Sequence, residues 1–553
     1  MSASNKKKLR KEKIDAVMTE RQRDEQKEQK KLKAYSITFT VVMVAVLIAA
    51  IGIGTFSFLK RSGFMQRRTV AAVVDGKELN SIDMTYYFVD AITKQYNSWQ
   101  QSFGENINLY TQMMGLDLTK PLSQQSNGDD STWSDFFIDQ AVQNAKSDAV
   151  LCKMAEAEGF TMPEADKKVL EETQKQMDEF IKAYGFESFD QYLKSYYGHG
   201  ASEETYNAYV EKSTLATAYL RTYSDNLKYE QSQINDYGKE HYNEFSSYSY
   251  NHYYLPSSSY LKDGTKDEQG KEVFTDEQKA EALKAAEADA KSLLSAKSAD
   301  ELDKLIAALP VNKENPHAEC ARNKLQLYME ISENIRTWIA DDSRKQGDIT
   351  MIPNYNTTAD EDGKETKELI GYIVVMFEGK DDNLESLDNV RHILVKFQST
   401  QPAGSTAGYT DEEKAAAKEK AEKILAEWKN GQANEDSFGE LATNKSDDDG
   451  TKALGGLIKN IHRGSNLVPS FLNWAIDDAR KEGDTGIIES EYGYHVMYSC
   501  APSQQTYRDF MIENTMHAND LDKWYESIME PVSAEKKDVS YLPTSYVIQP
   551  AAQ

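Results

Sequence analysis

One stretch of the chain carries no charged residue: residues 34–59, a run of 26 residues between Lys33 and Lys60. Its centre, VVMVAVLIAAIGIG, is strongly apolar. About 20 apolar residues suffice to cross the hydrocarbon core of a bilayer. The run is too long for a typical signal-peptide apolar region, and no clear cleavage site of small residues follows it. The pattern therefore predicts a transmembrane helix over residues 34–59.

After this run the polar and apolar positions alternate first with the period of strands and then with that of helices. Residues 70–79 predict two short strands joined by an Asp-Gly pair, which is typical of a type I′ hairpin turn. A helical pattern begins at Ser81, and residues 134–158 form a long amphipathic pattern. Thr161–Glu164 predicts a capping box that opens the next helix. These patterns predict a mostly helical domain over residues 69–244.

Two later parts of the chain repeat each other. Residues 337–348, TWIADDSRKQGD, match residues 473–484, NWAIDDARKEGD, at 7 of 11 positions from the tryptophan onward. Three further pairs of segments match in the same order: residues 251–255 with 391–395, residues 274–294 with 409–429, and residues 371–375 with 493–497. Each copy has the order strand, long helix, short helix, strand, which predicts an α+β domain with helices around a small central sheet.

The predicted organisation has six parts. They are a basic tail (1–33), a transmembrane helix (34–59), a helical domain (69–244), the first copy of the repeat (245–380), its second copy (388–501), and a closing helix with an extended tail (502–553). The fold class is therefore α+β with one N-terminal transmembrane helix.

Charge predicts the orientation in the membrane. Residues 1–33 hold 12 Lys and Arg residues, against four directly after the apolar run. The positive-inside rule then places the N-terminus in the cytoplasm and the bulk of the chain outside it, in a single-pass cell-membrane protein. The whole chain has a net charge of −26 although its tail is basic. Its acidic body argues against a nucleic-acid partner.

The sequence suggests no metal and no cofactor. The three cysteines, Cys152, Cys320 and Cys500, lie far apart and form no metal-binding motif. No glycine-rich phosphate-binding loop is present.

Five separated motifs occur in order in the second copy. They are Val390–Lys396 (VRHILVK), Phe438–Ala442 (FGELA), Leu454–Gly456 (LGG), Val468–Phe471 (VPSF) and Glu491–Val496 (EYGYHV). With these motifs the second copy resembles the parvulin-type peptidyl-prolyl isomerases of the PrsA, SurA and PpiD class of bacterial foldases. The helical domain is similar to the chaperone segment of that class.

The resemblance implies roles for particular residues. His392 and His495 match paired catalytic histidines that hydrogen-bond each other on neighbouring strands, and Asp448 matches a site position that is Cys or Asp in the family. The residues implied to bind the substrate proline are Leu467, Phe471, Ile461 and Val468. Ile461 stands where a Phe is usual, and Val468 where some members have a Gln. Taken without the resemblance, these residues could also be a core histidine pair, a solvated acidic loop and plain core.

The first copy departs further from the family. It retains His252, but Ile373 stands at the position of the second histidine. We therefore expect the first copy to be a degenerate parvulin-like domain without activity. We expect the whole chain to isomerise Xaa–Pro bonds in unfolded or newly secreted polypeptides and to act on them as a chaperone. The alternative is a non-catalytic holdase or assembly scaffold that uses both copies only for binding.

Overall fold

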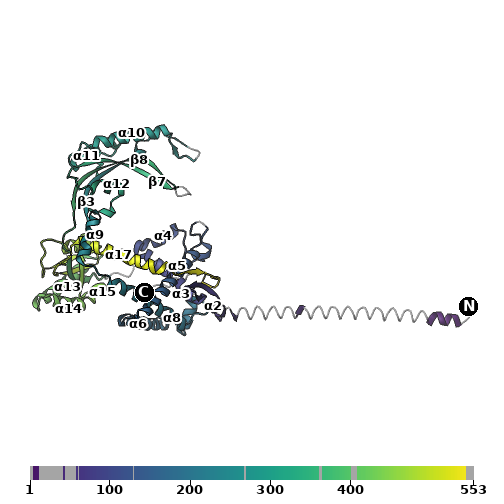
Figure 1. Ribbon diagram of the computed structural model, residues 1–553. Helices are drawn as coiled ribbons and strands as arrows, with labels where there is room; N and C mark the ends of the chain where they lie inside the picture. Colours follow the sequence, from purple (N-terminus) through teal and green to yellow (C-terminus); the bar gives the residue numbers. More distant parts are fainter. Residues whose placement is uncertain are drawn as a thin grey trace. The chain divides into compact units, whose positions relative to one another are not determined.

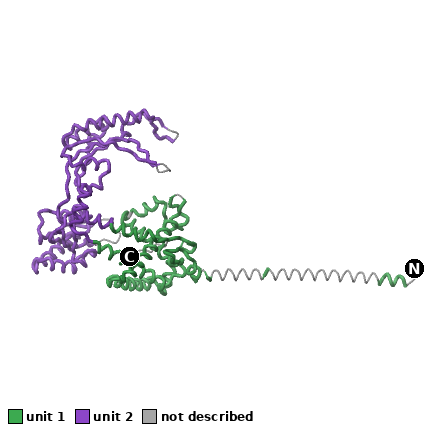
Figure 2. Tube along the Cα trace, in the orientation of Figure 1, with its two compact units in different colours: residues 1–227, 520–553 green, residues 228–519 purple. Residues whose placement is uncertain are grey.

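The computed structural model describes residues 4–11, 42–43, 58–59, 62–128, 130–266, 269–359, 364–399 and 408–543. The predicted transmembrane helix, residues 34–59, lies outside these residues except for two short pieces. Within the described ranges no helix has the length and apolar character needed to cross a membrane. The chain divides into two compact units, residues 1–227 with 520–553 and residues 228–519 (Figure 2).

In its described residues the first unit is mostly helical, with a small antiparallel sheet (Figure 1). The sheet has the order β13–β1–β2, formed by Ala534–Lys536, Val70–Val74 and Lys77–Asn80. The helices are α2 (Phe64–Arg68), α3 (Ser81–Phe103), α4 (Ile107–Met113), α5 (Trp133–Ala157), α6 (Glu164–Ala183), α7 (Phe189–Tyr197) and α8 (Glu203–Asn226). Its main core includes buried side chains of α3 and α5.

Local sequence explains how this unit begins. Asp75 and Gly76 both have positive φ, 49° and 73°, as the type I′ turn between β1 and β2 requires. The predicted hairpin is therefore present. The capping box predicted at Thr161–Glu164 is wrong, because α6 begins after Pro163 and no side chain caps it. The proline ring has no oxygen that could accept a bond from the first turn.

The end of the chain returns to the first unit. Strand β13 pairs antiparallel with β1, so that Ala72 lies opposite Lys536. The closing helix predicted in residues 502–553 is present as α17 (Tyr507–Met529), but the predicted extended tail adds a strand to the N-terminal sheet. The predicted domain boundary at residue 244 also differs, because residues 228–244 belong to the second unit.

The second unit contains the two copies of the repeat, and both have the same sheet. The first copy has the order β6–β3–β8–β7 and the second β10–β9–β12–β11, all antiparallel. The first-copy strands are β3 (Ser247–Pro256), β6 (Ala321–Leu327), β7 (Ile349–Ala359) and β8 (Glu365–Asp381). The second-copy strands are β9 (Asp388–Lys396), β10 (Leu457–Ile461), β11 (Thr485–Glu489) and β12 (Gly493–Ser499). The α+β class and the repeat are thereby confirmed.

Helices cover the sheets in both copies. In the first copy they are α10 (Asp276–Leu293), α11 (Ala299–Ala307) and α12 (Glu333–Ile339), preceded by α9 (Gln231–Glu240). In the second copy they are α13 (Asp411–Asn430), α14 (Glu435–Lys445), α15 (Asp449–Lys452) and α16 (Pro469–Ala475). Because side chains alternate along a strand, Ile393 and Val395 pack with α13 and α14, whereas Val390 and Met497 pack with α16 on the opposite face.

Candidate active site

The register of two central strands brings both predicted histidines together. His392 on β9 lies opposite Met497, and His495 on β12 lies opposite Leu394. The two histidines are therefore diagonal neighbours on one face of the sheet. Their Nδ1 atoms are 3.1 Å apart. Both residues are buried, with exposed fractions of 4% and 6%.

Three polar side chains lie within hydrogen-bond distance of the Nε2 atoms of the two histidines. Asp448 Oδ2 lies 2.9 Å from His392 Nε2, and Thr451 Oγ1 lies 3.0 Å from the same nitrogen. Thr451 also donates its hydroxyl to Asp448 Oδ2 at 2.5 Å. On the other side, Ser490 Oγ lies 2.8 Å from His495 Nε2. All four side-chain nitrogens of the two rings thus have a partner.

Burial keeps the two imidazoles neutral. It lowers the pKa of His392, although Asp448 opposes the effect. Burial, reinforced by the neighbouring His392 ring, lowers the pKa of His495 to about 4. Burial alone would raise the pKa of Asp448, but the hydroxyl of Thr451 and the ring of His392 outweigh it and leave that pKa below its usual value. At neutral pH the site therefore holds one carboxylate and two neutral rings.

These protonation states fix a direction for the hydrogen bonds. An ionised Asp448 can only accept, so His392 Nε2 carries the proton and donates to it. The Nδ1 atom of a neutral His392 must then accept from the Nδ1–H of His495. His495 Nε2 is left as an acceptor for the hydroxyl of Ser490. The result is a single chain of donors running from Ser490 to Asp448.

A cavity of about 660 Å³ opens above this pair. Phe471 stands edge-on to both rings, with centroids 5.2 Å from His392 and 5.4 Å from His495. The other lining residues are Leu394, Lys396, Asp448, Ile458, Asn466, Leu467, Val468, Pro469, Glu491 and Tyr492. The cavity thus has a polar floor and an apolar wall.

The structure brings together all but one of the residues predicted for the site. Leu467, Val468 and Phe471 line the cavity. Ile461 does not line it; this residue is 1% exposed and packs in the same apolar cluster as Phe471. Ile458, three residues earlier on β10, lines the cavity in its place.

Two residues of the network were missed by the sequence analysis. Asp448 precedes α15 and caps it, so a hydroxyl three residues later, Thr451, could have been recognised as its partner. Ser490 lies in the turn between β11 and β12 and bonds back to His495. Only the hairpin register indicates that contact.

The site combines an apolar wall with a fixed polar floor. Among the described residues no three His, Cys, Asp or Glu side chains come together to hold a metal ion. The two histidines are buried, and the polar groups are bonded to one another, so they are fixed before a substrate binds. Such a site can hold an apolar ring against its wall, above a floor whose polar groups are already bonded to one another.

Comparison with known proteins agrees with this arrangement. Residues 392–500 match the family described as "Rotamase: PPIC-type PPIASE domain". No curated protein sequence matches the chain. The second copy is thus a PPIC-type, or parvulin, domain, and the family resemblance predicted from its motifs is confirmed.

Solved structures similar to the chain include two PrsA proteins and a SurA-like chaperone. PrsA of Bacillus anthracis is 19% identical over 27% of this chain and 59% of its own, with a TM-score of 0.17. PrsA of Bacillus subtilis is 17% identical over 27% and 50%, with a TM-score of 0.19. A structure from the work on PEB4 and Cj1289, two SurA-like chaperones of Campylobacter jejuni, is 12% identical over 70% and 91%, with a TM-score of 0.14. The matches to the two PrsA proteins span between a half and three fifths of those chains.

Proposed function

Starting from the parvulin domain of residues 392–500, we propose that the chain is a peptidyl-prolyl cis–trans isomerase of the PrsA, SurA and PpiD class of foldases. The observation that supports this proposal most strongly is the chain of hydrogen bonds through His392 and His495, placed on the floor of an apolar cavity. Its substrates are Xaa–Pro bonds in unfolded or newly secreted polypeptides.

The proposed mechanism needs no bond between enzyme and substrate. Rotation about a peptide bond has a barrier of about 18–20 kcal/mol because the planar amide is conjugated. The substrate proline ring lies against Leu467, Val468 and Phe471, which excludes water from the bond. A twisted amide has a more basic nitrogen and a less polarised carbonyl than the planar one, so it loses less on leaving water. A dry cavity therefore favours the transition state over the planar substrate.

The two histidines and Asp448 fix the floor of the cavity in this proposal. Because both rings are neutral at pH 7, they add no charge that would favour the polar planar amide. Their mutual bonds leave few free donors, so the carbonyl of the planar substrate gains little from them. Asp448 acts through His392, whose orientation it holds.

The location of the chain is also proposed. The apolar run at residues 34–59 anchors it to the cell membrane, with the N-terminus in the cytoplasm and the bulk extracytoplasmic. Protease added to intact cells should then remove the bulk of the chain and spare only the first residues. Protection of the whole chain would contradict this topology.

The isomerase is tested by cis–trans exchange of a short Xaa–Pro peptide, followed by NMR. The full chain should accelerate exchange well beyond the uncatalysed timescale of tens of seconds. Phe471→Ala should lower the acceleration at least tenfold, because the proline loses its wall. Ile335→Ala, at the equivalent position of the first copy, is the matched control and should leave exchange unchanged.

A second candidate function is a holdase or assembly scaffold without catalysis. The first copy favours it, because Ile373 stands where the second histidine would be. A folded chain that delays aggregation of an unfolded protein but leaves peptide exchange at the uncatalysed rate would support the scaffold and reject the isomerase.

A further inference from the structure

The apolar wall of the cavity is carried by the segment that follows β10. Ile461 anchors the start of this segment in the core. The next residues, 462–465, form a tight loop in which the backbone N–H of Ser465 donates to the carbonyl of His462 at 2.8 Å. The N–H of Leu467 then donates to the carbonyl of Ser465 at 2.9 Å. The position of this loop therefore sets the position of Leu467 and the residues after it.

Arg463 ties this loop to groups outside the second copy. Its Nη1 donates to Glu385 Oε1 at 2.6 Å. Its Nη2 donates to Ser247 Oγ at 3.0 Å and to Asn383 Oδ1. Glu385 and Asn383 lie in the connection between β8 and β9, and Ser247 is the first residue of β3 in the first copy. The fork of the guanidinium thus joins the cavity loop to the degenerate copy.

The acceptors that receive Arg463 are themselves fixed. Ser247 and Asn383 are fully buried, with exposed fractions of 0%. Asn383 Nδ2 donates to the carbonyl of Phe245 at 2.9 Å. The side chain of Arg463 is only 22% exposed, so these charge-assisted bonds are largely shielded from water.

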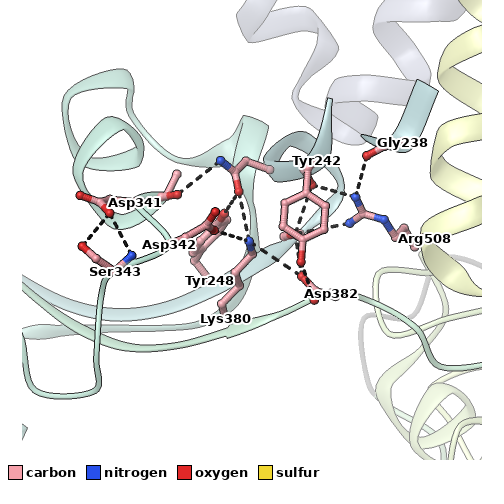
Figure 3. Close-up of polar contacts among 12 residues, drawn as sticks. Gly238, Tyr242, Tyr248, Asp341, Asp342, Ser343, Lys380, Asp382 and Arg508 are labelled. Atoms are coloured by element: carbon pink, nitrogen blue, oxygen red, sulfur yellow. Dashed lines mark hydrogen bonds and ion pairs between the residues drawn. The ribbon is translucent and has the colours of Figure 1, made fainter. Parts of the chain in front are cut away.

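The first turn of α17 supports the same loop from a second side. Arg508 is buried, donates to the carbonyl of Tyr242 at 2.8 Å and lies over the ring of Tyr242 (Figure 3). The preceding residue, Tyr507, stacks on His462 with centroids 4.2 Å apart. The guanidinium carbon of Arg463 lies 5.4 Å from the centroid of the same Tyr507 ring. The loop is therefore held by α17 as well as by β3.

We propose that Arg463 is a positioning residue for isomerisation, and that the first copy, through Ser247, is the support on which it acts. The inference rests on the proposed isomerase function and extends it by giving the degenerate copy a role in the other copy's site. Because the wall is already held in place, no binding free energy is lost in ordering it when the substrate binds. Loosening the loop therefore weakens substrate binding, whereas the bond between His392 and His495 stays intact.

The test compares kcat and KM of the full chain for a short Xaa–Pro peptide, with melting temperatures as a check on folding. Arg463→Ala should raise KM about fivefold and leave kcat within about a factor of two. Arg463→Lys, which can keep the bond to Glu385 but not the fork, should give an intermediate KM. Ser247→Ala removes one hydroxyl in the first copy and should raise KM about twofold.

Ser249→Ala is the matched control. Ser249 lies on the same strand and accepts a bond from the backbone N–H of Leu325, but it does not contact Arg463. Its KM should equal that of the unchanged chain. An unchanged KM in folded Arg463→Ala and Ser247→Ala chains, with only the melting temperature lowered, would overturn the inference and leave Arg463 as a structural link.

The result for Arg463 can be distinguished from the result for the proposed isomerase activity. Catalysis by the unchanged chain upholds the isomerase, whatever Arg463 does. If the unchanged chain binds the peptide without catalysis, the isomerase fails, and the dissociation constant from an NMR titration replaces KM. Dissociation constants that rise most for Arg463→Ala, less for Arg463→Lys and Ser247→Ala, and not for Ser249→Ala would still support the positioning role. Equal dissociation constants would reject it.

Discussion

In the first copy Ile373 lies on β8 opposite Tyr254, whereas in the second copy His495 lies on β12 opposite Leu394. The two positions are equivalent in the two sheets. Without a second histidine, His252 has its Nδ1 2.8 Å from the side-chain nitrogen of Asn323, so an amide takes the place of the imidazole. The first copy thus keeps one histidine but lacks the chain of hydrogen bonds that runs through both histidines in the second copy.

Other equivalent positions have kept the same contacts. Arg344 lies 4.6 Å from the Trp338 ring centroid, and Arg480 lies 4.4 Å from that of Trp474. A Cβ atom on Gly371 would collide with the carbonyl of Leu255, as one on its counterpart, Gly493, would with a carbonyl of β9. The contacts that hold the helices and strands together are therefore shared by the copies.

The comparison separates scaffold from site. The same strand order, glycine contact and Trp–Arg pair occur in both copies, but the second histidine and Phe471 occur in one, with Ile335 in place of Phe471 in the other. The fold alone therefore does not supply the proposed chemistry. The predictions that follow concern positions at which the copies differ or features that both share.

The largest effect is expected from His495→Ile, which gives the second copy the residue of the first. The substitution removes the donor to His392 Nδ1 and leaves that buried nitrogen unpaired. We expect kcat/KM for an Xaa–Pro peptide to fall about a hundredfold. NMR exchange of the peptide measures it.

The reverse substitution is the control for this prediction. Ile373→His, added to the His495→Ile chain, should not restore exchange. The Nδ1 atom of His252 is already bonded to the side chain of Asn323 and is not free to pair with a new histidine. Recovery of activity, or full activity of His495→Ile alone, would show that the histidine pair is not what distinguishes the copies.

A smaller effect is expected at Asp388, whose equivalent in the first copy is Tyr248. Burial, together with the nearby Asp478, raises the pKa of Asp388 to about 6. A pKa above that of the unfolded chain means that the folded state holds the proton more tightly. Stability from this group is therefore present in full below about pH 4 and is lost as the pH rises to about 6.

Asp388→Asn should remove this loss. Because the side chain is only about half buried, we expect the free energy of unfolding at pH 7 to rise by about 1 kcal/mol. At pH 4 the substitution should have little effect. Urea unfolding at the two pH values measures the difference, and an equal shift at both would mean that the carboxyl does not titrate as described.

The smallest effect concerns the pair that both copies share. Arg344→Ala and Arg480→Ala each remove a cation–π contact and an ion pair with an aspartate three residues earlier. Each should lower stability by about 0.5–1 kcal/mol. Thermal unfolding of the two variants should give similar shifts, and a large difference between them would mean that the copies do not share this contact in solution.

Much of the fold followed from the sequence because it is specified locally. The Asp75–Gly76 turn needs two residues that tolerate positive φ, and the sequence provides them. The repeat of TWIADDSRKQGD as NWAIDDARKEGD predicted two equivalent domains, and His392 and His495 were identified from motifs of a few residues. Such signals need only spacing, turn chemistry and periodicity.

The remaining features were decided by contacts between distant parts of the chain. No local pattern indicates that β13 pairs with β1, or that Ser490 bonds to His495. Nor does one indicate that Ile461 is buried in the core while Ile458 lines the cavity. The bond from Arg463 to Ser247 joins residues 216 positions apart. Which side chains meet over such distances depends on strand register and packing, and these are fixed only when the whole sheet and its helices come together.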